Sequence, residues 1–206
     1  STPRQVAPSP VEAIAHTSRE LLQALDEIVW AVNPRNDSLE QLAGYLEQHA
    51  REYLQGTAFE CEIHVPPQLP DVPLTSEVRH NVFLAFEEAL NNILKHSQAR
   101  SVSISMALEP CPSEAASALG HRNGAARWQT WFEVAVRDNG KGFDTLASRR
   151  QEQDGLSNMQ ARLQAVGGEC LVSSEPGSGT SVRLRFPLTT QAYRPNLGNE
   201  RTDKNK

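Results

Sequence analysis

The sequence predicts an α+β fold, a two-layer sandwich in which helices cover one face of a mixed, mainly antiparallel sheet. Apolar residues recur every three or four positions in some segments, as in amphipathic helices. They alternate in other, shorter segments, as in strands with one buried face. These segments follow one another as helix, helix, strand, helix, strand, strand, helix, strand, strand. Neither the glycine spacing of a Rossmann unit nor that of a Walker P-loop follows a strand.

Composition bounds the class of protein. The 206 residues are 38% hydrophobic and 22% charged, which fits one soluble globular domain with appendages. The net charge of −5 argues against sequence-independent binding of nucleic acid. No apolar run approaches the ~20 residues that span a bilayer, and no signal peptide is visible, so we expect no membrane contact from this segment. The three cysteines form no CxxC pair, which favours reduced thiols in a cytoplasmic protein over zinc or disulfides.

The amino-terminal part is expected to hold a flexible lead and two helices. Residues 1–10 carry three prolines among polar neighbours and predict the lead. Apolar residues at heptad positions predict a helix within 11–36, with a seam for another helix as in a short bundle. Ser38 and Gln41 then form a capping box that begins the second helix.

The rest of the chain alternates between regular elements and loops. Strands are predicted over 59–65, 102–108, 132–136, 170–174 and 181–188. Segments without periodicity predict a proline-rich connector over 66–73, a mobile insertion over 109–127 and a disordered tail over 190–206. Another helix opens at Gly155, and Gly167 is placed to stop it. Cys61 and Cys170 lie in apolar alternations and are expected in the core.

The stretch from Phe83 to His96 organises the chain. The buried stripe of this predicted α-helix comprises Val78, Val82, Phe86, Ala89 and Ile93. A second stripe, turned roughly 90° from the first, holds Glu88, Asn92, Lys95 and His96. A structural helix rarely carries four polar residues there, so this flank is expected to border a ligand. An amphipathic helix with solvated border residues is the alternative.

The residue types on this flank limit its chemistry. Asn92 offers a neutral amide oxygen, which suits a hard cation such as Mg²⁺. Glu88 can orient a metal-bound water or accept a proton. Lys95 and His96, one turn later, can contact phosphate oxygens.

A second candidate cluster follows the strand over 132–136. Asp138 is trailed by Gly140 and Gly142, which let the backbone come close to a ligand. A carboxylate at the strand end can accept a hydrogen bond from an exocyclic amine such as that of adenine. A plain Asp-Asn-Gly turn is the alternative for this fragment alone.

Two further segments complete the candidate site. Gly155 opens a helix whose free N–H groups and dipole suit an anionic phosphate, and residues 144–154 before it are expected to act as a lid. A glycine-rich hairpin turn leaves room beside a ligand, and Thr180 after it is expected to place a hydroxyl near Asp138. An ordinary loop and an ordinary hairpin are the alternatives.

Together and in this order, these segments resemble the GHKL superfamily of ATP-binding domains, which includes sensor histidine kinases, type II topoisomerases, Hsp90 chaperones and mismatch-repair ATPases. Glu-Glu-Ala-Leu-Asn-Asn-Ile-Leu-Lys-His at 87–96 is similar to the N box, Asp-Asn-Gly-Lys-Gly-Phe at 138–143 to the G1 box, and Gly-Leu-Ser-Asn-Met-Gln-Ala-Arg-Leu at 155–163 to the G2 box. The resemblance is greatest to bacterial two-component histidine kinases with short dimerisation helices, and it covers about residues 11–188. Residues 25–34 are similar to the end of the second dimerisation helix.

The resemblance implies a GHKL ATP-binding domain over 37–189 with ATP and Mg²⁺ as cofactors. It implies that Asn92 ligates Mg²⁺ and that Glu88 is the acid of the N box. It places Lys95 and His96 near the phosphates. It assigns the adenine amine to Asp138. The other residues expected in the ATP site are Gly140, Gly142, Gly155, Leu156 and Thr180.

The resemblance also implies an enzyme that transfers the γ-phosphoryl group of Mg·ATP to a histidine, for relay to the receiver domain of a response regulator. In this class the acceptor lies on the first dimerisation helix, before an acidic residue. His16 is followed by Thr-Ser, so the phosphoacceptor is expected to be absent from the chain. The parent protein is expected to be a homodimer through its dimerisation helices, and a membrane anchor elsewhere in it stays open.

Two alternatives remain. One is a kinase of the same superfamily that phosphorylates serine on a partner, as anti-sigma factors do. The other is a nucleotide-binding module that has lost turnover. The apolar seam within 14–32 and the Trp-Ala-Val-Asn-Pro ending favour the histidine kinase, because such a helix implies a dimerisation bundle.

Overall fold

A computed structural model of the chain describes residues 29, 33, 37–110, 130–145 and 154–188. Five predicted segments lie wholly or largely outside these residues, namely the lead over 1–10, the helix over 11–36, the insertion over 109–127, the lid over 144–154 and the tail over 190–206.

The described parts of the chain contain three α-helices and five strands. The helices are α2 (Leu39–Leu54), α3 (Ser76–Asn92) and α6 (Asp154–Ala165), and one turn of π-helix, η2 (Ile93–Ser97), continues α3. The strands are β1 (Glu60–His64), β2 (Ser101–Pro110), β3 (Thr130–Asp138), β4 (Glu169–Ser174) and β5 (Thr180–Leu188). From α2 onward the order of elements is the predicted one.

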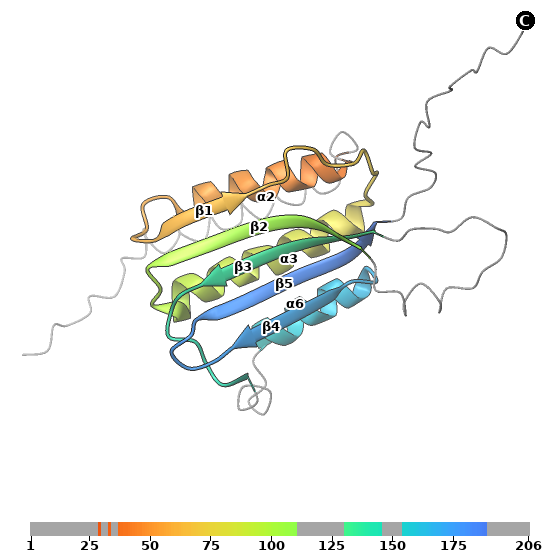
Figure 1. Cartoon of the computed structure of the whole chain (residues 1–206). Coiled ribbons are helices and arrows are strands. Elements are labelled where there is room, and N and C mark those ends of the chain that lie inside the picture. The colour runs from red at the N-terminus through yellow and green to blue at the C-terminus, as the bar shows by residue number, and fades with distance from the viewer. Residues whose placement is uncertain (1–28, 30–32, 34–36, 111–129, 146–153, 189–206) are drawn as a thin grey trace, which may run out of the picture.

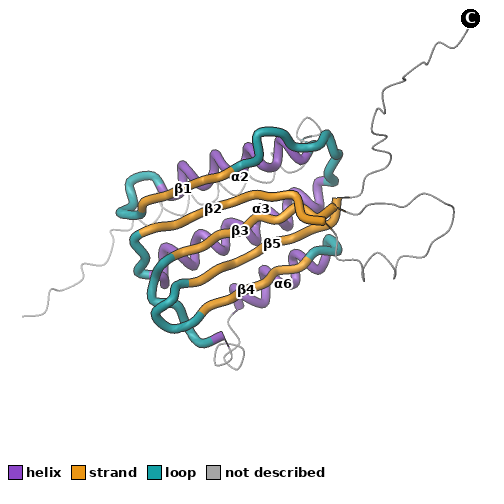
Figure 2. Tube along the Cα trace, viewed as in Figure 1, coloured by secondary structure: helices purple, strands orange, loops and turns teal. Residues whose placement is uncertain are grey.

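The strands form one sheet in the order β1-β2-β3-β5-β4. β1 pairs with β2 in parallel, and the other three pairs are antiparallel. All three helices lie on the same face of this sheet (Figures 1 and 2). The predicted sandwich of helices on a mixed, mainly antiparallel sheet is therefore confirmed.

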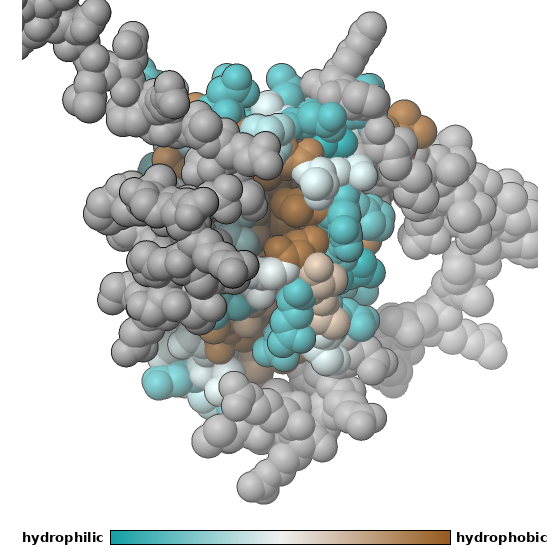
Figure 3. Space-filling view, turned by 90° about the vertical axis from the view of Figure 1, so that its right-hand side faces the viewer, coloured by the Kyte–Doolittle hydropathy of each residue, from teal (hydrophilic) through white to brown (hydrophobic). Residues whose placement is uncertain are grey.

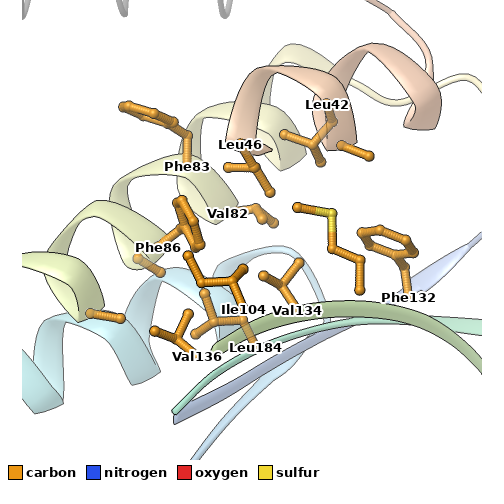
Figure 4. Packing of buried hydrophobic residues seen from close by; sticks show 14 of the residues in the cluster. Leu42, Leu46, Val82, Phe83, Phe86, Ile104, Phe132, Val134, Val136 and Leu184 are labelled. Carbon is orange, nitrogen blue, oxygen red and sulfur yellow. The ribbon is translucent and has the colours of Figure 1, made fainter. Parts of the chain in front are cut away.

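The core lies between the sheet and the helix layer. Figure 4 shows side chains of both layers, among them Leu42, Leu46, Val82 and Phe86 from the helices and Ile104, Phe132, Val134, Val136 and Leu184 from the strands. All of these are at most 1% exposed, and burying a side chain of this size contributes roughly 1.5–3 kcal/mol. The buried stripe predicted for α3 is confirmed except at Val78, which is only half-buried.

The ends of the helices follow the local sequence. The hydroxyl of Ser38 accepts a hydrogen bond from the Gln41 N–H at 3.2 Å, so the predicted cap of α2 is confirmed. Thr75 caps α3 in the same way. Gly167 follows α6 with a φ of 72°, in the left-handed region that favours glycine, and stops the helix as predicted.

Arg79 anchors the segment before α2 to the start of α3. Its side chain is fully buried and forms an ion pair with Asp37. It also donates hydrogen bonds to the carbonyl oxygens of Leu74 at 2.9 Å and Asn33 at 3.3 Å. A buried arginine needs such partners, and these contacts fix the chain around residue 37 against the helix layer.

Two expectations about the strands are wrong. Cys61 is exposed rather than in the core, because β1 is an edge strand of the described sheet. Cys170 is buried as expected. β2 runs two residues further than predicted, since Glu109 and Pro110 still pair with β3.

Figure 3 looks at the end of the sandwich where α2 and α3 begin. Apolar side chains gather in the middle of this face, and hydrophilic side chains border them. The ends of α3 and β3 lie at the other end of the molecule (Figure 1). The predicted site residues belong to that second end.

Candidate functional site

A cavity of about 580 Å³ lies where α3 and β3 end and α6 begins. Nine of the ten predicted site residues line it, namely Glu88, Asn92, Lys95, His96, Asp138, Gly142, Gly155, Leu156 and Thr180. Gly140 does not line the cavity. Segments that are far apart in the sequence therefore converge on one space.

Glu88 and Asn92 lie one turn apart at the end of α3, and both are half-buried. The amide of Asn92 donates a hydrogen bond to Glu88 Oε1 at 3.2 Å. Because the amide nitrogen faces Glu88, the amide oxygen is left for another ligand. The pair can thus offer carboxylate and amide oxygens to a hard cation.

The donor set fits Mg²⁺ better than a transition metal. Mg²⁺ takes oxygen ligands and is often held by only one or two protein groups, with water and phosphate oxygens completing its shell. Within the described ranges, no group of three or more His, Cys, Asp or Glu side chains is placed to hold a metal. Asn92 and Glu88 could supply two oxygen ligands to such a cation, with water or an anionic ligand filling the remaining positions.

Gly155 packs the start of α6 against this pair. A Cβ built at position 155 would lie 2.2 Å from Glu88 Oε1 and 3.7 Å from Asn92 Nδ2. A side chain at 155 would therefore displace Glu88. The close approach places the start of α6 beside the acid and the amide, and the positive end of a helix favours negative charge there.

Three side chains that can carry positive charge line the cavity. Lys95 and His96 lie in η2, and Lys141 lies in the turn after β3. All three are exposed, so their charged ends are free to meet an anionic ligand. The sequence predicts an α-helix through His96, whereas its last turn is π-helical, and π-helical turns are frequent at functional sites.

Asp138 is half-buried at the end of β3. Burial raises the pKa of its carboxyl group, and hydrogen bonds from Gly140 and Thr180 act in the opposite direction. The Gly140 N–H donates to Asp138 Oδ1 at 2.8 Å. A carboxylate has further lone pairs, so Asp138 can accept another hydrogen bond from the cavity. The predicted proximity of the Thr180 hydroxyl to Asp138 is confirmed.

The glycines after β3 are needed for close backbone packing. A Cβ at Gly140 would lie 2.1 Å from the carbonyl oxygen of Ser97, which also accepts a hydrogen bond from Lys141 N–H at 2.8 Å. Gly142 has a φ of 57°, and a Cβ there would lie 2.0 Å from the Glu175 carbonyl oxygen. Gly140 therefore shapes the pocket by docking the turn on η2, and it does not approach the cavity itself.

Asn139 holds this turn to β2. Its side-chain oxygen accepts hydrogen bonds from the backbone N–H groups of Arg100 at 2.9 Å and Ser101 at 3.0 Å. The Asp-Asn-Gly fragment thus has separate tasks, since Asp138 faces the cavity while Asn139 fixes the turn.

Several lining residues were not predicted, namely Ala89, Asn91, Ile93, Ser97, Val136, Lys141, Phe143 and Val182. Lys141 and Phe143 flank Gly142, so their place in the Gly-Lys-Gly-Phe stretch was a usable signal. Asn91 directly precedes Asn92. The apolar residues belong to buried stripes, and the sequence does not mark where such a stripe leaves the core and becomes a cavity wall.

Comparisons with known proteins place the chain among described families. A family model described as Histidine kinase-, DNA gyrase B-, and HSP90-like ATPase matches residues 77–190. The chain is 27% identical over 110 residues to the signal transduction histidine-protein kinase/phosphatase DegS of Brevibacillus brevis. It is 28% identical over 126 residues to the sensor histidine kinase LiaS of Bacillus subtilis (strain 168). These alignments cover 53% and 61% of this chain but only 23% and 29% of the relatives, so the matched part is less than a third of either protein.

Solved structures show the same fold. The histidine kinase domain from the Erythrobacter litoralis EL346 blue-light activated histidine kinase has a TM-score of 0.50 at 22% identity, over 82% of this chain and 72% of that one. The Acinetobacter baumannii histidine kinase AdeS has a TM-score of 0.53 at 13% identity, over 90% and 88% of the two chains. At these identities the likeness concerns the fold alone.

The sandwich and its cavity define a nucleotide-binding domain of the GHKL type. The family model covers more than half of the sequence, and the chain belongs to the family of histidine kinase-, DNA gyrase B- and HSP90-like ATPases. The predicted resemblance to sensor histidine kinases is confirmed by the relatives. In the part of the chain that the structure describes, no helix has the length and apolar composition needed to cross a bilayer.

Proposed function

We propose that the chain is the ATP-binding catalytic part of a sensor histidine kinase and that its cavity binds Mg·ATP. One observation carries this proposal. The Glu88–Asn92 pair and Asp138 line the same cavity, together with cationic side chains. Asp138 suits the adenine amine, the Glu88–Asn92 pair suits the metal, and the cationic side chains suit the phosphates.

The roles follow from the chemistry of each group. Asp138 would accept the hydrogen bond of the adenine amine, with Thr180 beside it. Asn92 would ligate Mg²⁺ through its amide oxygen, and Glu88 would orient a metal-bound water or accept a proton. Mg²⁺, when bound, would neutralise phosphate charge. Lys95 and His96 would contact the phosphates, Gly155 would admit them to the start of α6, and Leu156 would contact the nucleotide next to it.

Phosphoryl transfer depends mainly on positioning and on stabilising charge, with little covalent help from the protein. The exposed cations at the cavity suit charge stabilisation, because exposed side chains can change conformation to stay in contact with the phosphates. The half-buried Glu88 lies beside the start of α6 and lines the same cavity as these cations. We propose that the phosphoryl acceptor is a histidine of a dimerisation helix outside this chain.

The relatives' names support this direction, since DegS and LiaS are histidine kinases. In the parent protein we propose a homodimer through the dimerisation helices, relay of the phosphate to a response-regulator receiver domain, and a cytoplasmic location where ATP is available.

The chain alone should then acquire no acid-labile phosphate when incubated with radiolabelled Mg·ATP. Labelling of His16 would contradict the proposal that the acceptor histidine lies outside this chain.

The proposal predicts that Asn92→Ala weakens binding of ATP in the presence of Mg²⁺ by about tenfold or more, because a ligand to a charged group is lost. Asn81→Ala is the matched control. Asn81 lies on the same helix, its side chain donates to the Glu77 carbonyl oxygen at 3.0 Å, and it does not line the cavity.

Calorimetric titration with ATP, with Mg²⁺ and with a chelator, measures both variants against the wild type. We expect the Mg²⁺-dependent part of the affinity to vanish in Asn92→Ala and to persist in Asn81→Ala. Equal affinities in the two variants, or no heat with the wild type, would contradict the proposed site.

A further inference from the structure

Three polar side chains lie in a row across the strand ends beside the cavity. Ser174 of β4 pairs with Thr180 of β5, and Thr180 pairs with Asp138 of β3. Directly paired residues present their side chains on the same face of a sheet. Thr180 and Asp138 line the cavity, whereas Ser174 does not. Ser174 is thus one strand removed from the ligand space.

Ser174 is one of few buried polar residues in the described chain, with 8% of its surface exposed. Its hydroxyl accepts a hydrogen bond from the Phe143 N–H at 2.9 Å and donates one to the Gly179 carbonyl oxygen at 2.8 Å. It also lies 3.0 Å from the hydroxyl of Thr180. One small side chain therefore joins the turn after β3, the hairpin turn and the start of β5.

Each of these partners bears on Asp138 or on the cavity. Phe143 and Thr180 line the cavity. Gly179 has a φ of 75°, and a Cβ there would lie 2.0 Å from the Asp138 carbonyl oxygen. Ser174 thereby holds the backbone that packs directly on Asp138.

The hydroxyl groups of Ser174 and Thr180 can donate two hydrogen bonds in total, but more than two acceptors lie within their reach. Ser174 and Thr180 have one proton each, while the Gly179 carbonyl, the Asp138 carboxylate and the other hydroxyl can all accept. When the Thr180 hydroxyl points to Asp138, it satisfies the carboxylate. When an amine donates to Asp138 instead, Thr180 can turn its proton to Ser174, which keeps its own bond to Gly179.

We propose that Ser174 is a positioning residue for base recognition: it holds Thr180, Phe143 and Gly179 around Asp138 and accepts the Thr180 proton when the amine of the base occupies the carboxylate. The inference rests on the proposed function, in which the base is adenine. Guanine presents a carbonyl oxygen instead of an amine at the corresponding ring position, so the same device would favour adenine over guanine.

The test compares Ser174→Ala with Ser173→Ala by calorimetric titration of the whole chain with Mg·ATP and Mg·GTP. Ser173 is the neighbouring residue of β4 and is exposed. We expect Ser174→Ala to lose about tenfold in ATP affinity and to discriminate less against GTP, and Ser173→Ala to stay within about twofold of the wild type. Ser174→Thr keeps the hydroxyl and should restore most of the affinity.

A double-mutant cycle with Thr180→Val separates positioning from general stability. If the two hydroxyls act together, Ser174→Ala adds little to the loss already caused by Thr180→Val. Additive losses, or an ATP affinity and ATP-to-GTP ratio in Ser174→Ala equal to those of Ser173→Ala, would overturn the inference. If Ser174→Ala does not fold, Ser174→Cys takes its place, since a thiol is similar in shape but a weak donor. Failure of the proposed function is distinguishable, because the wild type itself would then not bind ATP.

Discussion

Under the proposed function, Asp138 would meet different demands in the free protein and in its complex with a nucleotide. Its burial raises the pKa of the carboxyl group, so the free fold disfavours the ionised form. Stability from such an acid is greatest when it is protonated and is lost as pH rises through its folded pKa. Recognition of an amine, however, needs the ionised acceptor. In the proposed site, the ionised Asp138 would therefore lower the stability of the free fold and favour binding of the amine.

Asp138→Asn should raise the midpoint of thermal unfolding at neutral pH, because it removes a partly buried charge. The same variant should bind ATP about tenfold more weakly or worse, since the amide replaces one acceptor oxygen by an NH₂ donor, while the Gly140 N–H still needs the remaining oxygen. Differential scanning fluorimetry and calorimetric titration measure the two effects. Asp71→Asn, at an exposed loop position, is the control.

The pH dependence follows from the same shift. Wild-type ATP affinity should fall as pH drops through the raised pKa of Asp138. This fall should begin at a higher pH than for an aspartate with its ordinary pKa of about 3.9. Asp138→Asn should lack this loss. A lower unfolding midpoint combined with unchanged ATP affinity would contradict the role given to this residue.

Single residues were predictable where chemistry marks them in the sequence. Asp138 stands directly after an apolar strand, and Asn92 shares a helical flank with Glu88, so both were found. Ser174 was missed because serine is common at strand ends and its task depends on partners from two other segments. Arg79 was missed for a similar reason, since its buried ion pair joins residues 42 positions apart.

At the scale of elements, the contact between α3 and α6 shapes the end of the cavity where Glu88 and Asn92 lie. Gly155 lets the start of α6 approach Glu88, and Gly44 in α2 offers a contrast, because a Cβ there meets nothing within 4 Å. Both glycines lie in helices, so alanine changes the helix propensity at both positions. The added methyl group meets a neighbouring side chain only at position 155.

Gly155→Ala should weaken Mg·ATP binding by about tenfold, because the added methyl group displaces the Glu88 carboxylate. Gly44→Ala should leave binding unchanged and stabilise the fold by about 0.5–1 kcal/mol, since alanine favours a helix interior. Urea unfolding and calorimetric titration of both variants check the prediction. Wild-type ATP affinity in Gly155→Ala would show that this helix start does not border the nucleotide.

The elements themselves were predictable because each carries a clear periodicity. The incorrect predictions concern the ends of elements and the edge of the sheet, where neighbouring strands determine pairing and exposure. Strand pairing extends β2 to Pro110, and the edge position of β1 exposes Cys61. The π-helical turn at Ile93–Ser97 was not visible because its residues have the same pattern as the α-helix before it.

At the scale of the whole molecule, an aromatic cluster joins α2 to α3. The ring of His49 lies 5.4 Å from that of Tyr53 and 4.8 Å, edge-on, from that of Phe83. Its Nε2 atom is buried and has no hydrogen-bond partner. Burial lowers the pKa of His49, and the Glu52 carboxylate opposes this shift only in part.

Because the folded pKa of His49 is lowered, its contribution to stability is present above the ordinary histidine pKa of about 6.5 and is lost as pH falls below it. The wild type should therefore lose more thermal stability between about pH 7.5 and about pH 5.5 than His49→Phe, which keeps the aromatic packing. Replacement of the exposed His64 by phenylalanine is the control. An equal loss in wild type and His49→Phe would exclude this contribution.

The layer arrangement was predictable from the order of elements, since helices with one apolar stripe must cover a sheet with one apolar face. The convergence of residues 88–96, 138–142, 155–156 and 180 on one cavity was expected from the resemblance to a family, because periodicity carries no information about contacts between distant segments. The structure supplies those contacts.

The central claim is that these segments surround one nucleotide. Amide NMR spectra of the isotope-labelled chain, recorded during titration with Mg·ATP, test it most directly. We predict that amides within 88–97, 138–143, 155–156 and at Thr180 shift along one common binding curve, while those at 76–80, at the other end of α3, do not move. Shifts confined to other regions, or separate curves for the separate segments, would contradict the account.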